Sequence, residues 1–142
     1  MMIRALSIAA IIAVGATAVY AQGAEIDQRK ASMKAIGAAA KEPGAIMKGE
    51  ASFDLQKVQA SLVVYQEQAA KLKDLWPESS KSGDTKASPA VWESKDQFLA
   101  LFDKFGAEAK AASSAITDEA SFKANWPKVM SSCGGCHKNY RQ

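Results

Sequence analysis

Both cysteines and the single histidine of this 142-residue chain lie close together near its C-terminus, in the segment Cys133-Gly134-Gly135-Cys136-His137. This C-x-x-C-H spacing marks covalent attachment of a c-type haem. On a helix the two cysteines are one turn apart, so both sulfurs can reach the vinyl groups of a single porphyrin. His137 follows Cys133 by four residues on the same face, where its imidazole can bind the iron. The motif predicts one haem c per chain, bonded through Cys133 and Cys136, with His137 as the proximal axial ligand.

Three other uses of a cysteine pair stay open beside haem, although the rest of the sequence supports each of them less well. A thioredoxin-like dithiol needs a strand–helix context, which is missing here. Zinc usually takes four ligands, and the chain has no further Cys or His to supply them. A plain structural disulfide that closes so small a loop constrains the unfolded chain little.

The N-terminus has the layout of a secretory signal peptide. Arg4 supplies the positive charge, residues 5–19 are uncharged, and Val19-Tyr20-Ala21 offers small residues at the −3 and −1 positions. A short membrane anchor is the alternative, but the uncharged run is shorter than the roughly 20 residues needed to span a bilayer. We expect a signal peptide over residues 1–21, cleavage near Ala21, and one mature domain over residues 22–142 in a bacterial periplasm.

Composition narrows the classes of function. Hydrophobic residues make up 48% and charged residues 23%, as in an ordinary soluble domain. The formal charge of +3 comes from 18 basic and 15 acidic residues, and loss of Arg4 with the signal peptide lowers it to +2. This excess is too small and too scattered to indicate nucleic-acid binding. No second apolar segment predicts membrane insertion of the mature chain.

The mature sequence favours helices throughout, because Ala, Lys, Glu, Leu and Gln dominate it and strand alternation is scarce. We expect helices over about residues 25–48, 53–75, 89–115 and 117–140. Within these ranges we expect a kink or early end at Pro43-Gly44 and a bend at Pro127. We also expect an N-cap at Ser52 and a helix start at Ser88-Pro89. Four amphipathic helices joined by short loops predict an all-α, antiparallel four-helix bundle.

The C-terminal position of the haem motif resembles the class II c-type cytochromes, namely cytochrome c′ and its low-spin relative cytochrome c-556. Class I cytochromes c place the motif near the N-terminus instead. Further resemblance lies in Arg29–Gly37 and Pro89–Trp92, and the last segment, Cys133–Arg141, contains the motif itself. The resemblance covers nearly the whole mature chain. It implies a left-handed four-helix bundle with the haem held between helices, near the C-terminal one.

The residue opposite His137 decides the function that this resemblance implies. In cytochrome c-556 a Met of the first helix binds the iron and the protein carries electrons, and Met33 matches that position. Met33 therefore implies a low-spin His/Met electron carrier. The alternative is a five-coordinate cytochrome c′-type protein that binds nitric oxide or carbon monoxide, with Met33 as core filling. Met47 lies about 21 Å further along the same helix, and Met130 shares a helix with His137, so both are weaker candidates.

The resemblance also implies haem contacts for Arg29 (a propionate), Arg141 (near the proximal His) and Trp92 (the porphyrin edge). Their alternatives are solvated arginines and a core tryptophan, and Trp76 is a second candidate for the edge. A small peroxidase would need a distal His, Arg or carboxylate, and none is evident, so we expect no enzyme. We expect redox proteins as partners, a monomer or homodimer, and a modest docking rim of lysines: Lys34, Lys48, Lys128 and Lys138.

Overall fold

A computed structural model describes the backbone of residues 7–142 and the side chains of residues 23–142. The elements in chain order are α1 (Ser7–Ala39), α2 (Lys41–Met47), α3 (Leu55–Leu72), the 3₁₀ helix η1 (Glu78–Ser80), α4 (Ala90–Glu93), α5 (Lys95–Ala115) and α6 (Glu119–Tyr140). The described residues contain no strand beyond an isolated antiparallel bridge between Ala87 and Arg141. The predicted all-α class is confirmed.

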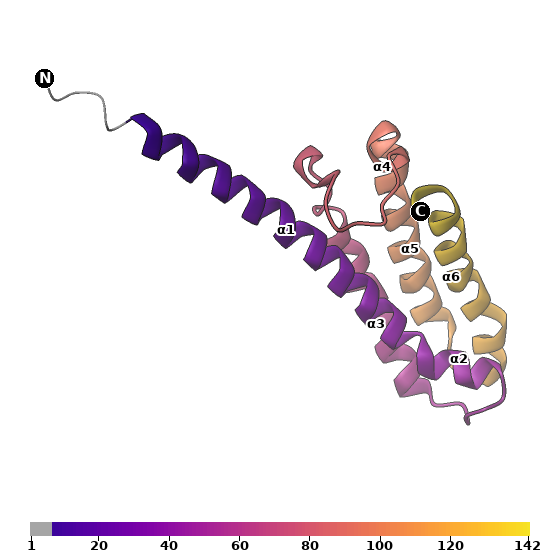
Figure 1. Cartoon of the computed structure of the whole chain (residues 1–142). Coiled ribbons are helices and arrows are strands. Elements are labelled where there is room, and N and C mark those ends of the chain that lie inside the picture. The colour runs from indigo at the N-terminus through magenta and orange to yellow at the C-terminus, as the bar shows by residue number, and fades with distance from the viewer. Residues whose placement is uncertain (1–6) are drawn as a thin grey trace, which may run out of the picture.

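Four helices form the bundle: the C-terminal part of α1, then α3, α5 and α6, which run alternately down and up (Figure 1). Helix α1 packs on α3, α3 on α5, and α5 on α6. Within the described residues, α1 and α6 make no comparably close approach to each other. The bundle is therefore tightly packed on three of its four sides.

The N-terminal part of α1 extends away from the bundle (Figure 1). The predicted signal peptide, residues 1–21, lies outside the residues whose side chains are described, so cleavage near Ala21 stays a prediction. In the part of the chain that the structure covers, no helix is both long and apolar enough to cross a membrane.

The core follows the helical spacing of apolar residues. Along α3 these residues recur every three or four positions and are buried: Val58, Leu62, Tyr65, Ala69 and Leu72. They divide between two clusters. One cluster surrounds Tyr65, Phe122 and Trp126 toward the α2 end, and the other surrounds Trp76 and Phe98 toward the α4 end.

One predicted helix boundary is corrected, and the predicted early end of the first helix is confirmed, three residues before Pro43. The N-cap of α3 is Asp54 instead of Ser52, and its carboxylate accepts a hydrogen bond from the Lys57 N–H at 3.2 Å. The first helix breaks at Ala40, before Pro43, and a short second helix contains the proline. A proline clashes with the carbonyl four residues earlier, here Ala39, which is where α1 ends.

The predicted third helix is divided in two at Ser94, whose backbone (φ −128°, ψ 46°) is not helical. Neither Pro nor Gly marks this position in the sequence. The short α4 places Val91 and Trp92 in the core. In contrast, α6 continues through Pro127, and its N-cap Asp118 forms a capping box with Ser121.

The loop between α3 and α4 is joined to the C-terminal tail. The Ser88 N–H donates to the Tyr140 carbonyl at 2.9 Å, and the Gln142 N–H donates to the Lys86 carbonyl at 2.9 Å. The Ala87–Arg141 bridge lies between these bonds. Residues 85–88 are therefore held beside the end of the helix that carries the haem motif.

Candidate haem-binding site

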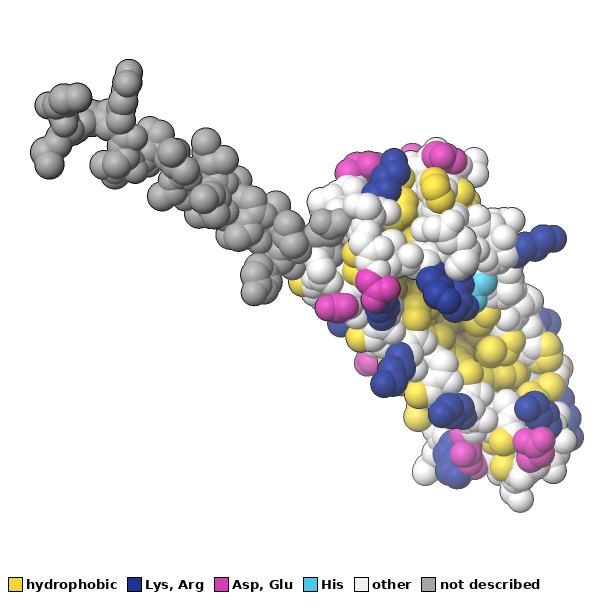
Figure 2. Space-filling view, viewed as in Figure 1, with side chains coloured by type: hydrophobic (Ala, Val, Ile, Leu, Met, Phe, Trp, Pro, Cys, Tyr) yellow, Lys and Arg dark blue, Asp and Glu magenta, His cyan; other side chains and the backbone are white. Residues whose placement is uncertain are grey.

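A cavity of about 630 Å³ lies between α1 and α6, on the side of the bundle that direct helix packing leaves open. Its opening is visible as a hollow lined by hydrophobic side chains, with the histidine at its edge (Figure 2). Apolar residues from three places form the walls: Ile26, Met33 and Ile36 on α1, Met130 and Tyr140 on α6, and Trp76, Phe98 and Phe102 opposite. The volume is within the range of roughly 300–1,000 Å³ that is typical of cofactor sites.

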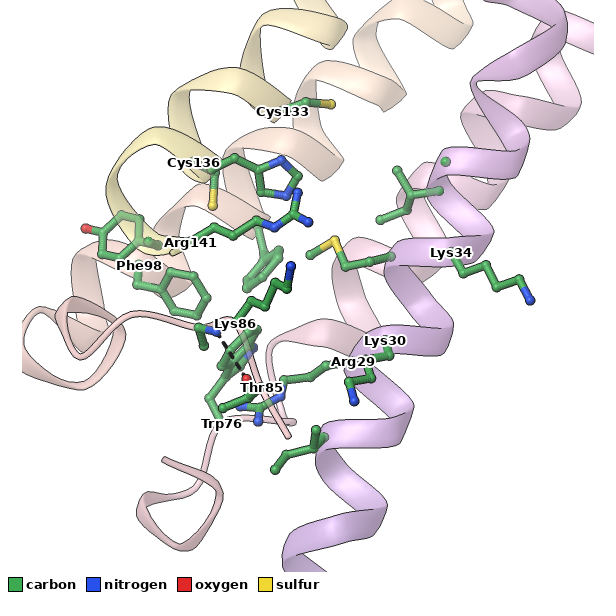
Figure 3. Close-up of a pocket in the computed structure, with 18 of the residues that line it drawn as sticks. Arg29, Lys30, Lys34, Trp76, Thr85, Lys86, Phe98, Cys133, Cys136 and Arg141 are labelled. Atoms are coloured by element: carbon green, nitrogen blue, oxygen red, sulfur yellow. Dashed lines mark hydrogen bonds between the residues drawn. The ribbon is translucent and has the colours of Figure 1, made fainter. Parts of the chain in front are cut away.

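Cys133 and Cys136 lie on α6 at the wall of this cavity (Figure 3), half-buried and not joined to each other. Burial raises the pKa of both thiols, and the neighbouring Cys133 adds to the effect on Cys136. Within the described residues no group of three or more His, Cys, Asp or Glu side chains could hold a metal ion. The pair thus presents neither a disulfide nor the remainder of a zinc site, but two free sulfurs facing an apolar cavity.

His137 lines the same cavity one turn after Cys133. Partial burial and the positive charge of Arg141 lower the pKa of its imidazole. Both causes disfavour the protonated form, and the neutral ring is the form that binds iron. Arg141 also lines the cavity, and its side chain reaches from the end of α6 toward α1 (Figure 3).

Two methionines line the cavity, Met33 from α1 and Met130 from α6. Met130 is on the same helix as His137, and its sulfur accepts a long hydrogen bond from the Tyr65 hydroxyl at 3.9 Å. Met33 is half-buried on the opposite wall. Met47 is 36% exposed and lies outside this cavity. Met33 is thus the cavity methionine on the wall that faces the helix of His137.

Arg29 is only 4% exposed and connects α1 to the loop after α3. Its guanidinium donates to the Ser80 hydroxyl at 3.2 Å and to the Ser80 carbonyl at 3.0 Å. It also lies over the ring of Trp76, 4.3 Å from the centroid, and 5.8 Å from that of Trp92. Burial lowers the pKa of Arg29, an effect that the charge of Glu25 opposes. The result is a buried cation at the cavity wall.

The two candidate tryptophans differ in position. Trp76 lines the cavity, and its buried indole N–H has no hydrogen-bond partner among the described residues. Trp92 is not a lining residue; it packs against Trp76 with ring centroids 6.1 Å apart and donates its N–H to the Pro77 carbonyl at 3.2 Å. A contact of Trp92 with haem stays a prediction.

The residues fit a covalently bound haem. Two free thiols and a neutral imidazole stand on one helix face beside an apolar cavity, and the buried Arg29 cation and the unpartnered Trp76 N–H suit a carboxylate group. Apart from Trp92, all the site residues predicted from the sequence line this cavity: Arg29, Met33, Cys133, Cys136, His137 and Arg141.

Apart from Trp76, sequence reasoning missed the lining residues that come from the α3–α4 loop and from α5. Phe98 and Phe102 were visible only as core residues of an amphipathic helix. Thr85 and Lys86 lie in a polar loop with no pattern that points to a site. Their place at the cavity depends on the bridge between Ala87 and Arg141, which joins segments far apart in the sequence.

Comparison with known proteins agrees with this geometry. Residues 24–141 match the family described as Cytochrome C′. The chain is 44% identical over 142 residues to a protein named cytochrome c′ from Rhodopseudomonas palustris, covering 99% of this chain and 97% of the relative. It is 37% identical over 127 residues to a cytochrome c-556 from Agrobacterium fabrum, covering 89% and 86%. The solved structure of cytochrome c′ from Rhodopseudomonas palustris matches with a TM-score of 0.81 at 46% identity, covering 83% of this chain and 95% of that one.

Proposed function

Since the chain belongs to the cytochrome c′ family and carries a covalently bound haem c, we propose that it is a low-spin electron carrier of the periplasm. In this proposal Cys133 and Cys136 form the thioether bonds, His137 is the proximal ligand and Met33 the distal one. The observation that carries it is the position of Met33, on the cavity wall formed by α1, facing the helix of His137. The relatives include proteins of both names, so the ligand at this position is what separates the two functions.

The haem supplies a one-electron ferric/ferrous couple. The protein's part is to hold and shield it. Cys133 and Cys136 fix one edge to α6, and the aromatic wall of Trp76, Phe98 and Phe102 excludes water. Two protein ligands held by helices of the bundle need little rearrangement when the iron changes its oxidation state. A thioether ligand raises the reduction potential of the haem.

We assign the haem carboxylates to the end of the cavity near Arg29 and Trp76. Arg29 is a buried cation that donates hydrogen bonds to uncharged Ser80, and the charge of Glu25 offsets only part of its desolvation. A buried charge is costly unless it is paired. A carboxylate beside it would compensate the charge, and the indole N–H of Trp76 would gain an acceptor. Arg141 would remain near the proximal side, since it follows His137 by one helical turn.

The residues that line the haem cavity suit electron transfer better than they suit catalysis. His137 and Asp84 are the only imidazole and carboxylate side chains that line the cavity in the described residues. Asp84 is at the exposed rim, paired with Lys30 at 2.5 Å. Arg29, also on α1, is held by Ser80 and lies over Trp76. Both groups therefore already have partners at the wall or rim of the cavity, which does not favour a role for them in peroxide cleavage.

A second candidate, a five-coordinate protein that binds nitric oxide or carbon monoxide, is favoured by the 44% identity to a protein named cytochrome c′. In that case Met33 would pack in the wall of the cavity as an apolar side chain without binding iron. The two candidates share every other residue of the site.

Absorption spectra of the purified holoprotein test the proposal. We expect a low-spin ferric form and a ferrous form that resists carbon monoxide. The substitution Met33→Leu, which keeps apolar volume but removes the thioether, should give a high-spin ferric form and ready binding of carbon monoxide. Met130→Leu is the matched control and should leave both properties unchanged. A wild type that is already high-spin and binds the gas would contradict His/Met ligation and support the second candidate.

A further inference from the structure

We propose that the mouth of the haem cavity is a docking surface for a redox protein whose electron-transfer face carries Asp and Glu carboxylates. The surface is formed by four exposed side chains that line the cavity, Lys30, Lys34, Lys86 and Arg141, which we call the cationic rim. This inference rests on the proposed electron-carrier function, since it requires that electrons enter and leave at this mouth.

The cationic rim is assembled from three distant parts of the sequence. Lys30 and Lys34 lie one turn apart on α1, Lys86 is in the α3–α4 loop, and Arg141 follows α6. The Ala87–Arg141 bridge and the Gln142-to-Lys86 hydrogen bond hold the loop and the tail together. As a result Lys86 and Arg141 extend toward the same cavity (Figure 3), and basic side chains border the hollow on the surface (Figure 2).

Acidic side chains are scarce at this mouth. Asp84 is the only Asp or Glu that lines the cavity in the described residues, and it pairs with Lys30. Within the same part of the chain, no carboxylate lies within ion-pair distance of Lys34, Lys86 or Arg141. Several lysines away from the mouth do have such partners: Lys57 with Glu42, Lys73 with Asp103, and Lys123 with Glu119.

This arrangement concentrates the positive charge of the protein. Four rim cations less Asp84 give +3, whereas the predicted mature chain as a whole has only +2, so all its other residues together have a net charge of −1. The buried Arg29 on the same side is balanced by the charge of the nearby Glu25. The two haem carboxylates lower the +3 of the rim, and the mouth keeps +1.

A local excess of this size favours partners of opposite charge. Complementary charges steer encounter and orient the partner more than they raise affinity. Salt weakens the effect, because the Debye length falls from about 30 Å at 0.01 M to about 8 Å at 0.15 M. The predicted lysines Lys48, Lys128 and Lys138 do not line the mouth, so we do not include them in this surface.

Electron transfer to small probes of opposite charge tests the sign of the mouth. Oxidation of the ferrous protein by the anion hexacyanoferrate(III) should slow as ionic strength rises, and oxidation by the cation tris(phenanthroline)cobalt(III) should accelerate. At low ionic strength Lys34→Glu and Lys86→Glu should each slow the anionic probe by roughly three- to tenfold. Lys110→Glu is the matched control, because it changes net charge equally at an exposed α5 lysine that does not line the cavity. Equal slowing by rim and control variants would overturn the proposal.

A redox-inert anion gives a second measurement on the wild type alone. Paramagnetic hexacyanochromate(III) should broaden the amide resonances of Lys34 and Lys86, and leave those around Lys110 sharp. Broadening spread evenly over the surface, or centred elsewhere, would refute a docking surface at the mouth. Both experiments compare rim and control positions in the same ligation state, and the broadening is measured relative to the spectrum without hexacyanochromate. The spin state reports the axial ligation separately, so failure of this inference and failure of the proposed function are distinguishable.

Discussion

The substitution Arg29→Met tests how the loop that forms one wall of the haem cavity is held in place. Arg29 connects α1 to η1 through its hydrogen bonds to the hydroxyl and carbonyl of Ser80, which is completely buried. Its guanidinium also covers the face of Trp76. Methionine retains an apolar stem but removes the charge and every donor.

The expected cost follows from these contacts. The buried Ser80 carbonyl loses its Arg29 donor, which costs about 1–3 kcal/mol. Loss of the cation–π contact with Trp76 costs about 1–2 kcal/mol at a desolvated site. Release of a buried guanidinium from its desolvation penalty offsets part of this sum. From these contacts alone we expect a loss of about 1–3 kcal/mol of unfolding free energy. In the holoprotein, loss of the proposed haem carboxylate's partner adds to this cost.

Urea denaturation of the holoprotein, followed by circular dichroism, measures this loss. Lys30→Met is the matched control, since it removes a neighbouring α1 cation that contacts the same loop. Its ion pair with Asp84 is exposed, and such pairs contribute about 0–1 kcal/mol. Hydrogen exchange should quicken in residues 78–81 of the Arg29→Met protein only. If the two substitutions cost the same and exchange there is unchanged, the reasoning about the buried cation is wrong.

Two further predictions concern the haem bonds and the pH dependence. The wild type should keep its haem through acid-acetone extraction and have the mass of the apoprotein plus one haem. The double substitution Cys133→Ala, Cys136→Ala should release the haem. Free extraction of haem from the wild type would exclude thioether bonds. Burial raises the pKa of Tyr65 far above its ordinary value of about 10. The folded protein then holds this proton more tightly than the unfolded chain, so stability is complete below pH 10 and falls as pH rises above it. Tyr65→Phe should reduce that alkaline fall in the urea midpoint, with little change at neutral pH because the hydroxyl's partner is a weak sulfur acceptor.

The part of the site that could be predicted from sequence is the part that helical spacing determines. Cys133, Cys136 and His137 are within about one turn of a single helix, so any helix in this region places them on one face. The α3 stripe that contains Tyr65 follows the same rule. Met33 needed more than spacing, because its relation to α6 comes from the packing of two helices distant in sequence.

The rest depended on tertiary contacts that leave no local pattern. The resemblance favoured Trp92 over Trp76 for the porphyrin edge, but only the packed loop places Trp76 at the cavity. The helix break at Ser94 is not indicated in the sequence by a Pro or Gly. Lys86 reaches the cavity because a loop pairs with the last residues of the chain. A polar residue in an exposed loop has no periodicity from which such a position could be inferred.

The open side of the bundle links the proposed haem ligation to the packing of the helices. In the part of the chain that the structure describes, α1 packs on α3 and α6 on α5, but α1 and α6 do not pack closely on each other. The cavity takes up the space between them. Met33 is on the first of these helices and His137 on the second. In the proposed ligation the haem is bonded to both, and it thereby supplies the fourth interface that side chains alone do not make. The same bonds that set the chemistry of the iron would then hold α1 against α6, so loss of Met33 ligation should loosen α1 as well as open the iron to ligands.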